Sequence, residues 1–240
     1  ISILPLDINK SDVEFTSENN SIRIGLKAVK GMEKSFLDSI VSARKERAFT
    51  SLQDFVRRTS VNKNVTENLI LGGAFDWFSA NRRCMLWDLP KLYHSKQGSL
   101  FLEAPGSSKM ADFSPFERWL KEYAVLSLTA QGHIMDFFRP KLPQGVLTSK
   151  MAALRKEGTL QVAGLVIRPH RPPTRSGKTV VFLTLEDEYG LVDVTIFEDI
   201  YKKYAQTIFN KPLLLVAGEV SQRDPNERVS IIASHIQPLS

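Results

Sequence analysis

Apolar and polar residues alternate with the period of a β-strand through the last third of the chain. Five segments share this pattern: 159–167, 179–187, 191–197, 213–220 and 229–236. Between the third and fourth segments, apolar residues recur at helical spacing over 198–209, and Pro212 ends that helix. Three strands, one helix and two strands in this order predict an OB-fold, a small closed barrel of five strands, over residues 158–240.

In the first part of the chain, apolar residues recur three and four positions apart, which is typical of amphipathic helices. A small hairpin between 1–5 and 22–26 is predicted to precede these helices. Residues 1–93 are therefore predicted to form a helical block. Residues 94–157 contain a Gly-, Ser- and Pro-rich stretch and are predicted to be a connector with helices, one of them over 151–156. The predicted fold class is multi-domain α and β, a helical block followed by a five-stranded OB-fold barrel.

The composition sets broad limits on what the chain is. Its 240 residues suit two domains, 42% of them are hydrophobic, and the net charge of +6 is consistent with a polyanionic partner. Cys84 is the single cysteine, so an internal disulfide is excluded and a reducing compartment such as the cytoplasm is expected. No apolar run has the length of a membrane span, so no membrane partner is expected. Because the first residues from Ile1 already resemble a strand, we expect a piece of a longer polypeptide.

One loop of the predicted barrel concentrates positive charge. Between the first two strands lie four basic residues with no acidic residue among them: Arg168, Arg171, Arg175 and Lys178. The loop between the last two strands carries Arg223, diluted by Asp224 and Glu227. Since these loops and the face of the second and third strands meet nucleic acid in OB-folds, we predict single-strand binding here. The alternative is a solvated, proline-stiffened loop on a protein-binding barrel. Phe182 and Phe197 are candidate stacking platforms, and at least one of them is expected in the core.

Two tight turns between predicted helices offer backbone N–H groups to a phosphate. The first is centred on Gly31, and the basic residues around it are Lys27, Lys30 and Lys34. It resembles a helix-hairpin-helix turn, but Glu33 stands where that motif usually has glycine, so a purely structural turn is the alternative. The second turn offers a phosphate three residues: Asn62, Lys63 and Asn64. Helix capping would explain Asn62 alone, and the sequence leaves Arg82 and Arg83 open between solvent and phosphate.

Several short segments, taken in order, carry a family resemblance. In the first half they are GLKAVKG (25–31), FTSLQDF (49–55) and GAFD (73–76), the last followed by Asn81 and Arg82. In the second half they are GLV (164–166), FLTLEDEYG (182–190) and Phe197 with Tyr201 and Tyr204. Together these segments resemble the bacterial C-family DNA polymerases, the polymerase III alpha subunits. The segment VAGLV (162–166) and the short spacers favour the error-prone branch, which implies translesion synthesis and DNA repair.

The resemblance implies a tandem helix-hairpin-helix region that grips duplex DNA and an OB-fold that holds the single-stranded template. The parent chain would be a DNA-directed DNA polymerase, a nucleotidyltransferase of the bacterial cytoplasm. Its palm domain, with the carboxylates that bind Mg²⁺, is expected before residue 1. We therefore predict no catalytic residue, no metal site and no cofactor here, and an independent nuclease or hydrolase is disfavoured. The four histidines are far apart in sequence: His94, His133, His170 and His235.

A short segment of the connector suggests a protein partner. Gln97, Leu100 and Phe101 form a Gln-x-x-Leu-Phe pattern that resembles the peptide by which bacterial polymerases bind the sliding clamp. Leu100 and Phe101 would be apolar anchors, and Gln97 would bond at the rim of the pocket. The alternative is that both apolar side chains pack on neighbouring helices. A second overall function is therefore kept open, an interaction platform that binds the clamp or an accessory factor with little DNA contact.

Overall fold

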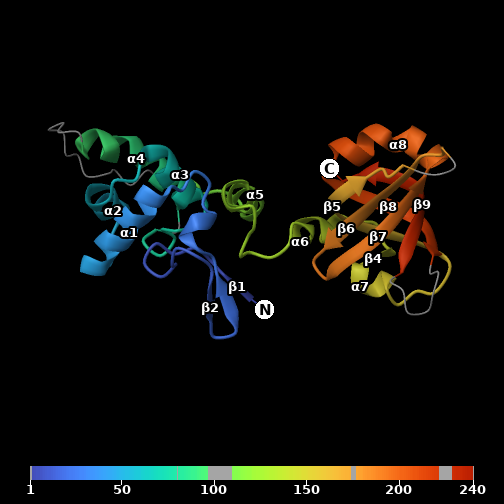
Figure 1. The fold of residues 1–240 in the computed structure, drawn as a ribbon, viewed down its shortest axis with the longest axis horizontal. Coiled ribbons are helices and arrows are strands. Elements are labelled where there is room, and N and C mark those ends of the chain that lie inside the picture. Colours follow the sequence, from blue (N-terminus) through green and yellow to red (C-terminus); the bar gives the residue numbers. More distant parts are fainter. Residues whose placement is uncertain (1, 80, 97–109, 174–176, 222–228, 240) are drawn as a thin grey trace. The chain divides into compact units, whose positions relative to one another are not determined.

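The structure is a computed structural model that describes residues 2–79, 81–96, 110–173, 177–221 and 229–239. The chain divides into two compact units, Ile1–Gln131 and Gly132–Ser240 (Figure 1). We call them the N-terminal unit and the barrel unit. The boundary between them lies inside the segment 94–157 that the sequence predicts to be a connector.

The barrel unit is built on the strands that the sequence predicts. They are β5 (Thr159–His170), β6 (Val180–Asp187), β7 (Gly190–Phe197), β8 (Leu213–Ser221) and β9 (Ser230–Pro238), with α8 (Glu198–Asn210) between β7 and β8. The strands lie in the order β5-β6-β7-β9-β8, and β8 also pairs with β5, which closes the barrel. The β7–β9 pair is parallel and the other pairs of the barrel are antiparallel. The predicted five-stranded OB-fold is therefore confirmed.

Every second side chain of the central strands β6 and β7 points into the barrel. The buried apolar side chains of β6 and β7 are Val181, Leu183, Leu185, Val192, Val194 and Ile196. Their neighbours along each strand point to the outer face, since successive side chains of a strand alternate. Ile208 of α8 joins the same core, and Figure 1 shows α8 and α7 (Ser149–Ala152) on opposite sides of the barrel.

Short elements precede the barrel, and Arg139 from one of them binds the β6–β7 turn. They are α6 (Met135–Phe138), η2 (Arg139–Lys141) and β4 (Val146–Leu147), and β4 pairs with β5 in parallel. The Arg139 guanidinium forms ion pairs with Asp187 at 3.0 Å and Glu188 at 2.6 Å. The Ser149 backbone N–H donates to the same Asp187. The prediction of a helix over 151–156 is wrong in its bounds, because Thr148 caps the helix by accepting a hydrogen bond from the Met151 backbone N–H.

A small sheet lies near the start of the N-terminal unit. It contains β1 (Ser2–Leu4), β2 (Thr16–Glu18) and β3 (Ser21–Arg23), in the order β1-β3-β2. Asn19 and Asn20, with φ of 46° and 61°, form the tight turn that joins β2 to β3 in an antiparallel hairpin. The prediction of a hairpin between 1–5 and 22–26 is wrong, because β1 pairs with β3 in parallel.

The predicted helical block is present in the described part of the N-terminal unit. Its elements are η1 (Leu26–Ala28), α1 (Lys34–Glu46), α2 (Leu52–Arg58), α3 (Lys63–Leu71), α4 (Arg82–Lys96) and α5 (Pro115–Leu126). The rings of Phe49, Phe55 and Phe75 meet edge-to-face in its core, with centroids 5.2 and 5.0 Å apart. Among helices in the described ranges, none is both long enough and apolar enough to cross a membrane.

Arg82 lies in this core and is not a surface residue. Its side chain is 2% exposed and forms ion pairs with Asp76 at 2.7 Å and Glu122 at 3.4 Å. It also donates to the Leu71 carbonyl. Gly73, at φ +84°, leaves room for the guanidinium, because a Cβ at this position would lie 2.4 Å from Arg82 Nη2. Of the two expectations for Arg82, solvent or phosphate, neither holds.

Candidate nucleic-acid interface

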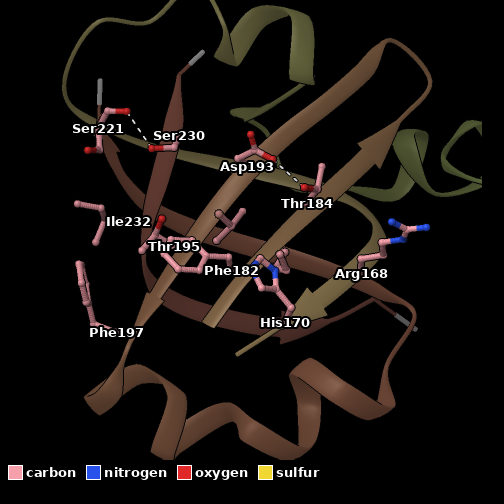
Figure 2. Close-up of a pocket in the computed structure, with 12 residues that line it drawn as sticks. Arg168, His170, Phe182, Thr184, Asp193, Thr195, Phe197, Ser221, Ser230 and Ile232 are labelled. Carbon is pink, nitrogen blue, oxygen red and sulfur yellow. Dashed lines mark hydrogen bonds between the residues drawn. The ribbon is translucent and has the colours of Figure 1, made fainter. Parts of the chain in front are cut away.

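A groove of about 630 Å³ crosses the outer face of the barrel. Its floor is the outer face of β6 and β7, and its borders are the end of β5 and the facing ends of β8 and β9 (Figure 2). The strand register sets its side chains in cross-strand neighbours, with Phe182 opposite Thr195 and Thr184 opposite Asp193. This is the face at which OB-folds bind nucleic acid.

Aromatic rings occupy one side of this groove. His170 and Phe182 are stacked, with centroids 5.6 Å apart and ring planes 28° from parallel. Phe197, one strand further, is 48% exposed. The expectation that Phe182 or Phe197 belongs to the core is wrong, because Val181, Leu183 and Ile196 fill the interior and alternation turns both phenylalanines outward.

Positive charge lies at the β5 edge of the groove. Arg168 has a left-handed φ of 45° at an irregularity in the β5–β6 pairing, and its side chain lines the groove. A bulge of this kind re-aims a side chain away from the regular ladder. Arg171 follows, with its guanidinium 5.6 Å from the centre of the Tyr201 ring. Arg171 and Lys178 both line a neighbouring hollow of about 420 Å³ in the first loop of the barrel.

Other predicted residues lie outside the described part of the chain. They are Arg175 and Arg223 in the barrel loops, and Gln97, Leu100 and Phe101 in the connector. Conversely, sequence reasoning missed polar residues of the groove, namely Thr184, Asp193, Thr195 and Ser230. The signal for the first three was available, because they alternate with the buried residues of β6 and β7.

Some polar groups in the turn of the first hairpin already have partners within the protein. The Lys30 backbone N–H donates to the Val125 carbonyl at 2.8 Å, and Lys27 forms an ion pair with Glu14 at 2.7 Å. Gly31 has the left-handed φ expected of it, at +79°. Glu33 and Lys34 are exposed at the start of α1.

The turn of the second hairpin borders a hollow of about 730 Å³. Asn62 caps α3 by accepting a hydrogen bond from the Val65 backbone N–H at 2.9 Å, which is the capping role that the sequence offered as an alternative. Asn64 is exposed, and Lys63 lies 3.7 Å from Glu67. Lys63 also lines the hollow, and so does Lys96 from the end of α4. The Lys63–Glu67 ion pair is therefore looser than the Lys27–Glu14 ion pair of the first hairpin.

Two families of known proteins match this chain, one in each unit. A family described as "Helix-hairpin-helix motif" matches residues 1–85, and one described as "OB-fold nucleic acid binding domain" matches residues 160–239. The error-prone DNA polymerase of Symbiobacterium thermophilum is 38% identical over 96% of this chain and 26% of that protein. The chain is homologous to a helix-hairpin-helix and OB-fold region of such polymerases.

The chain is also similar to a DNA polymerase III subunit alpha. The DNA polymerase III subunit alpha of Bacillus subtilis is 30% identical over the whole chain, which covers 23% of that protein. The error-prone polymerase of Bdellovibrio bacteriovorus is 31% identical over 25% of its length. The chain thus spans about a quarter of the length of these curated relatives. Within the described residues, no three His, Cys, Asp or Glu side chains cluster in a way that could hold a metal ion.

Proposed function

We propose that this chain is a non-catalytic, DNA-binding part of a bacterial C-family DNA polymerase. Its hairpins hold duplex DNA, and its barrel groove holds the single-stranded template during template-directed synthesis. The observation that carries the proposal is the groove over β6 and β7, where exposed aromatic rings and the Arg168 edge lie together.

The aromatic side of the groove supplies platforms for bases. Phe182, backed by His170, and Phe197 are set in the groove lining, so their rings lose little freedom when a base stacks on them. Stacking of this kind stabilises a complex by about 1–3 kcal/mol per base and tolerates any sequence. This is what a template-holding surface requires.

The cationic edge supplies contacts for the sugar–phosphate chain. Arg168 and Arg171 leave the end of β5, and Lys178 leads into β6, so positive charge follows one border of the groove. Arg175 and Arg223 are proposed, from the sequence, to contact phosphate as well. Phosphate contacts fix the strand in register without reading its sequence.

The hairpin turns are proposed to contact the duplex backbone. Lys27, Lys30, Gly31 and Lys34 form the first contact set, and Asn62, Lys63 and Asn64 form the second. Lys63 is proposed to contribute more than Lys27, because its carboxylate partner Glu67 is 3.7 Å away, whereas Glu14 lies 2.7 Å from Lys27. Nucleotidyl transfer would be the work of a Mg²⁺-binding palm domain elsewhere in the parent polymerase of the bacterial cytoplasm. A sliding-clamp contact by Gln97, Leu100 and Phe101 remains a proposal on sequence alone.

The proposal is tested by fluorescence anisotropy of the whole chain with single-stranded and primer–template DNA across a salt series. Phe197→Ala should weaken single-strand binding about tenfold, since one stacking platform is lost. Phe209→Ala is the matched control, because Phe209 is 49% exposed on α8 of the same unit but does not line the groove. The proposal is overturned if both variants behave alike. No measurable binding to either DNA, even at low salt, would instead favour the protein-interaction platform.

A further inference from the structure

The groove floor is divided into an aromatic row and a polar row. The first row runs across the strands through four side chains: His170, Phe182, Thr195 and Ile232. The second row lies one pleat further along and contains Thr184, Asp193 and Ser230. Figure 2 shows Asp193 joined to Thr184 and set apart from the rings of Phe182 and Phe197. A strand stacked on the first row therefore presents base edges to the second.

Charge within the groove sets the orientation in which a nucleotide binds. Among the described residues of the lining, Asp193 is the acidic side chain and Arg168 is the arginine. A phosphate is attracted to Arg168 at the β5 edge and repelled from Asp193 on β7. The sugar–phosphate chain therefore lies towards Arg168, and the bases lie towards Asp193.

The Asp193 carboxylate is held in place and can only accept hydrogen bonds. The Thr184 hydroxyl donates to Asp193 Oδ1 at 2.7 Å, which orients the exposed carboxylate in the groove. An ionised carboxylate has acceptor oxygens and no donor. Cytosine meets it with an exocyclic amine, and acidic side chains accept hydrogen bonds from this N4 amine. Thymine carries a carbonyl oxygen at the equivalent position, which the carboxylate repels.

We infer that Asp193 makes the barrel groove prefer cytosine over thymine, as a specificity-determining residue that Thr184 positions. The inference rests on the proposed single-strand function of the same groove and adds to it a base preference. Because a single charge-assisted hydrogen bond at a solvent-open site is involved, the preference is expected to be about fivefold.

Anisotropy titrations of the whole chain with dye-labelled oligo(dC) and oligo(dT) of equal length, at pH 8 and fixed salt, measure this preference. The readout is the ratio of the two dissociation constants. Removal of one negative charge strengthens binding of both strands, and the ratio cancels that general effect. Asp193→Asn keeps the side-chain shape and an acceptor for Thr184 but adds an amide donor, so its ratio should fall to about 1. Asp199→Asn, an equal charge change on α8 outside the groove lining, should keep the native ratio.

The possible results separate this inference from the function on which it rests. A native preference for oligo(dC) that disappears in Asp193→Asn and persists in Asp199→Asn supports it. Equal affinities for the two strands in the native chain, or a preference that survives Asp193→Asn, overturn it and leave single-strand binding intact. Loss of binding to both strands in the native chain overturns the proposed function itself.

Discussion

The buried Arg82 cluster gives a quantitative test of what holds the N-terminal unit together. Arg82→Met fills a similar volume but removes the guanidinium between Asp76 and Glu122. Breaking a buried ion pair by removing one partner costs about 3–5 kcal/mol. The lower end of that range, about 3 kcal/mol, is expected here. Asp76 is 35% exposed and regains water, whereas Glu122, at 3%, does not.

The pKa of Glu122 adds a pH dependence to this prediction. Burial raises the pKa of Glu122 above its ordinary value. The Ala130 backbone N–H and the Arg82 guanidinium lower that pKa but only partly offset the effect of burial, since the guanidinium makes its shorter bonds to Asp76. In Arg82→Met the folded-state pKa of Glu122 should rise further. A carboxyl whose folded pKa lies above its unfolded value lowers stability as the pH rises between the two. The variant should therefore lose less stability at pH 5 than at pH 8.

The assay is urea unfolding followed by tryptophan fluorescence. Trp77, Trp87 and Trp119 are the chain's three tryptophans, and all belong to Ile1–Gln131, so the signal reports the N-terminal unit alone. With an m-value of about 2 kcal/mol/M, the midpoint should shift by about 1.5 M. Arg82→Met/Glu122→Gln should recover part of the loss, because the stranded charge is gone. A loss below about 1 kcal/mol, or a double variant no better than the single, would refute the reasoning.

Two further predictions concern the same unit. Burial raises the pKa of Asp54, but the Thr50 backbone N–H and the Arg58 and Arg47 guanidinium groups outweigh it and hold that pKa below its ordinary value. The stabilisation is therefore complete above the unfolded pKa of about 4 and is lost as pH falls through the folded value. Unfolding of Asp54→Asn between pH 3 and 6 should show a flatter pH profile than the native chain, and equal profiles would contradict the assignment. Lys63→Ala should reduce the salt slope of duplex binding by about 0.9, the value for one phosphate contact, and Lys27→Ala by less; equal slopes in all three proteins would contradict the hairpin assignment.

The order of elements in the barrel could be predicted from the sequence, because hydrophobic periodicity and the residues that end helices and strands are local properties. The predicted helix 198–209 and the observed α8 differ by one residue, since Pro212 and the acidic start mark its ends. The direction in which each strand face points was harder to predict. Alternation places Phe182 on the same face as Thr184 and Glu186, yet phenylalanine is more often buried than exposed, so its position and its identity point to opposite faces.

Other features depend on partners that are distant in sequence. Arg82 looks like a surface residue in a helical pattern because its second carboxylate, Glu122, is forty positions away. The β1–β3 pair could not be predicted either. Two successive apolar segments suggest a hairpin. The turn at Asn19 and Asn20, whose φ angles are left-handed, instead pairs β3 with β2, which is closer in sequence.

The same distinction explains which half of the proposed DNA-binding surface the sequence predicts. A run of cations such as Arg168 to Lys178 is visible without any structure, and it identifies where a phosphate chain is attracted. The surface that is proposed to meet the bases arises from strand register instead. Thr184 and Asp193 come from neighbouring strands, and Ser230 joins them from β9. Because phosphate contacts position a strand and base contacts discriminate, the run of cations can be found from the sequence, whereas the pairing of Thr184 with Asp193, the proposed base-selecting group, depends on strand register.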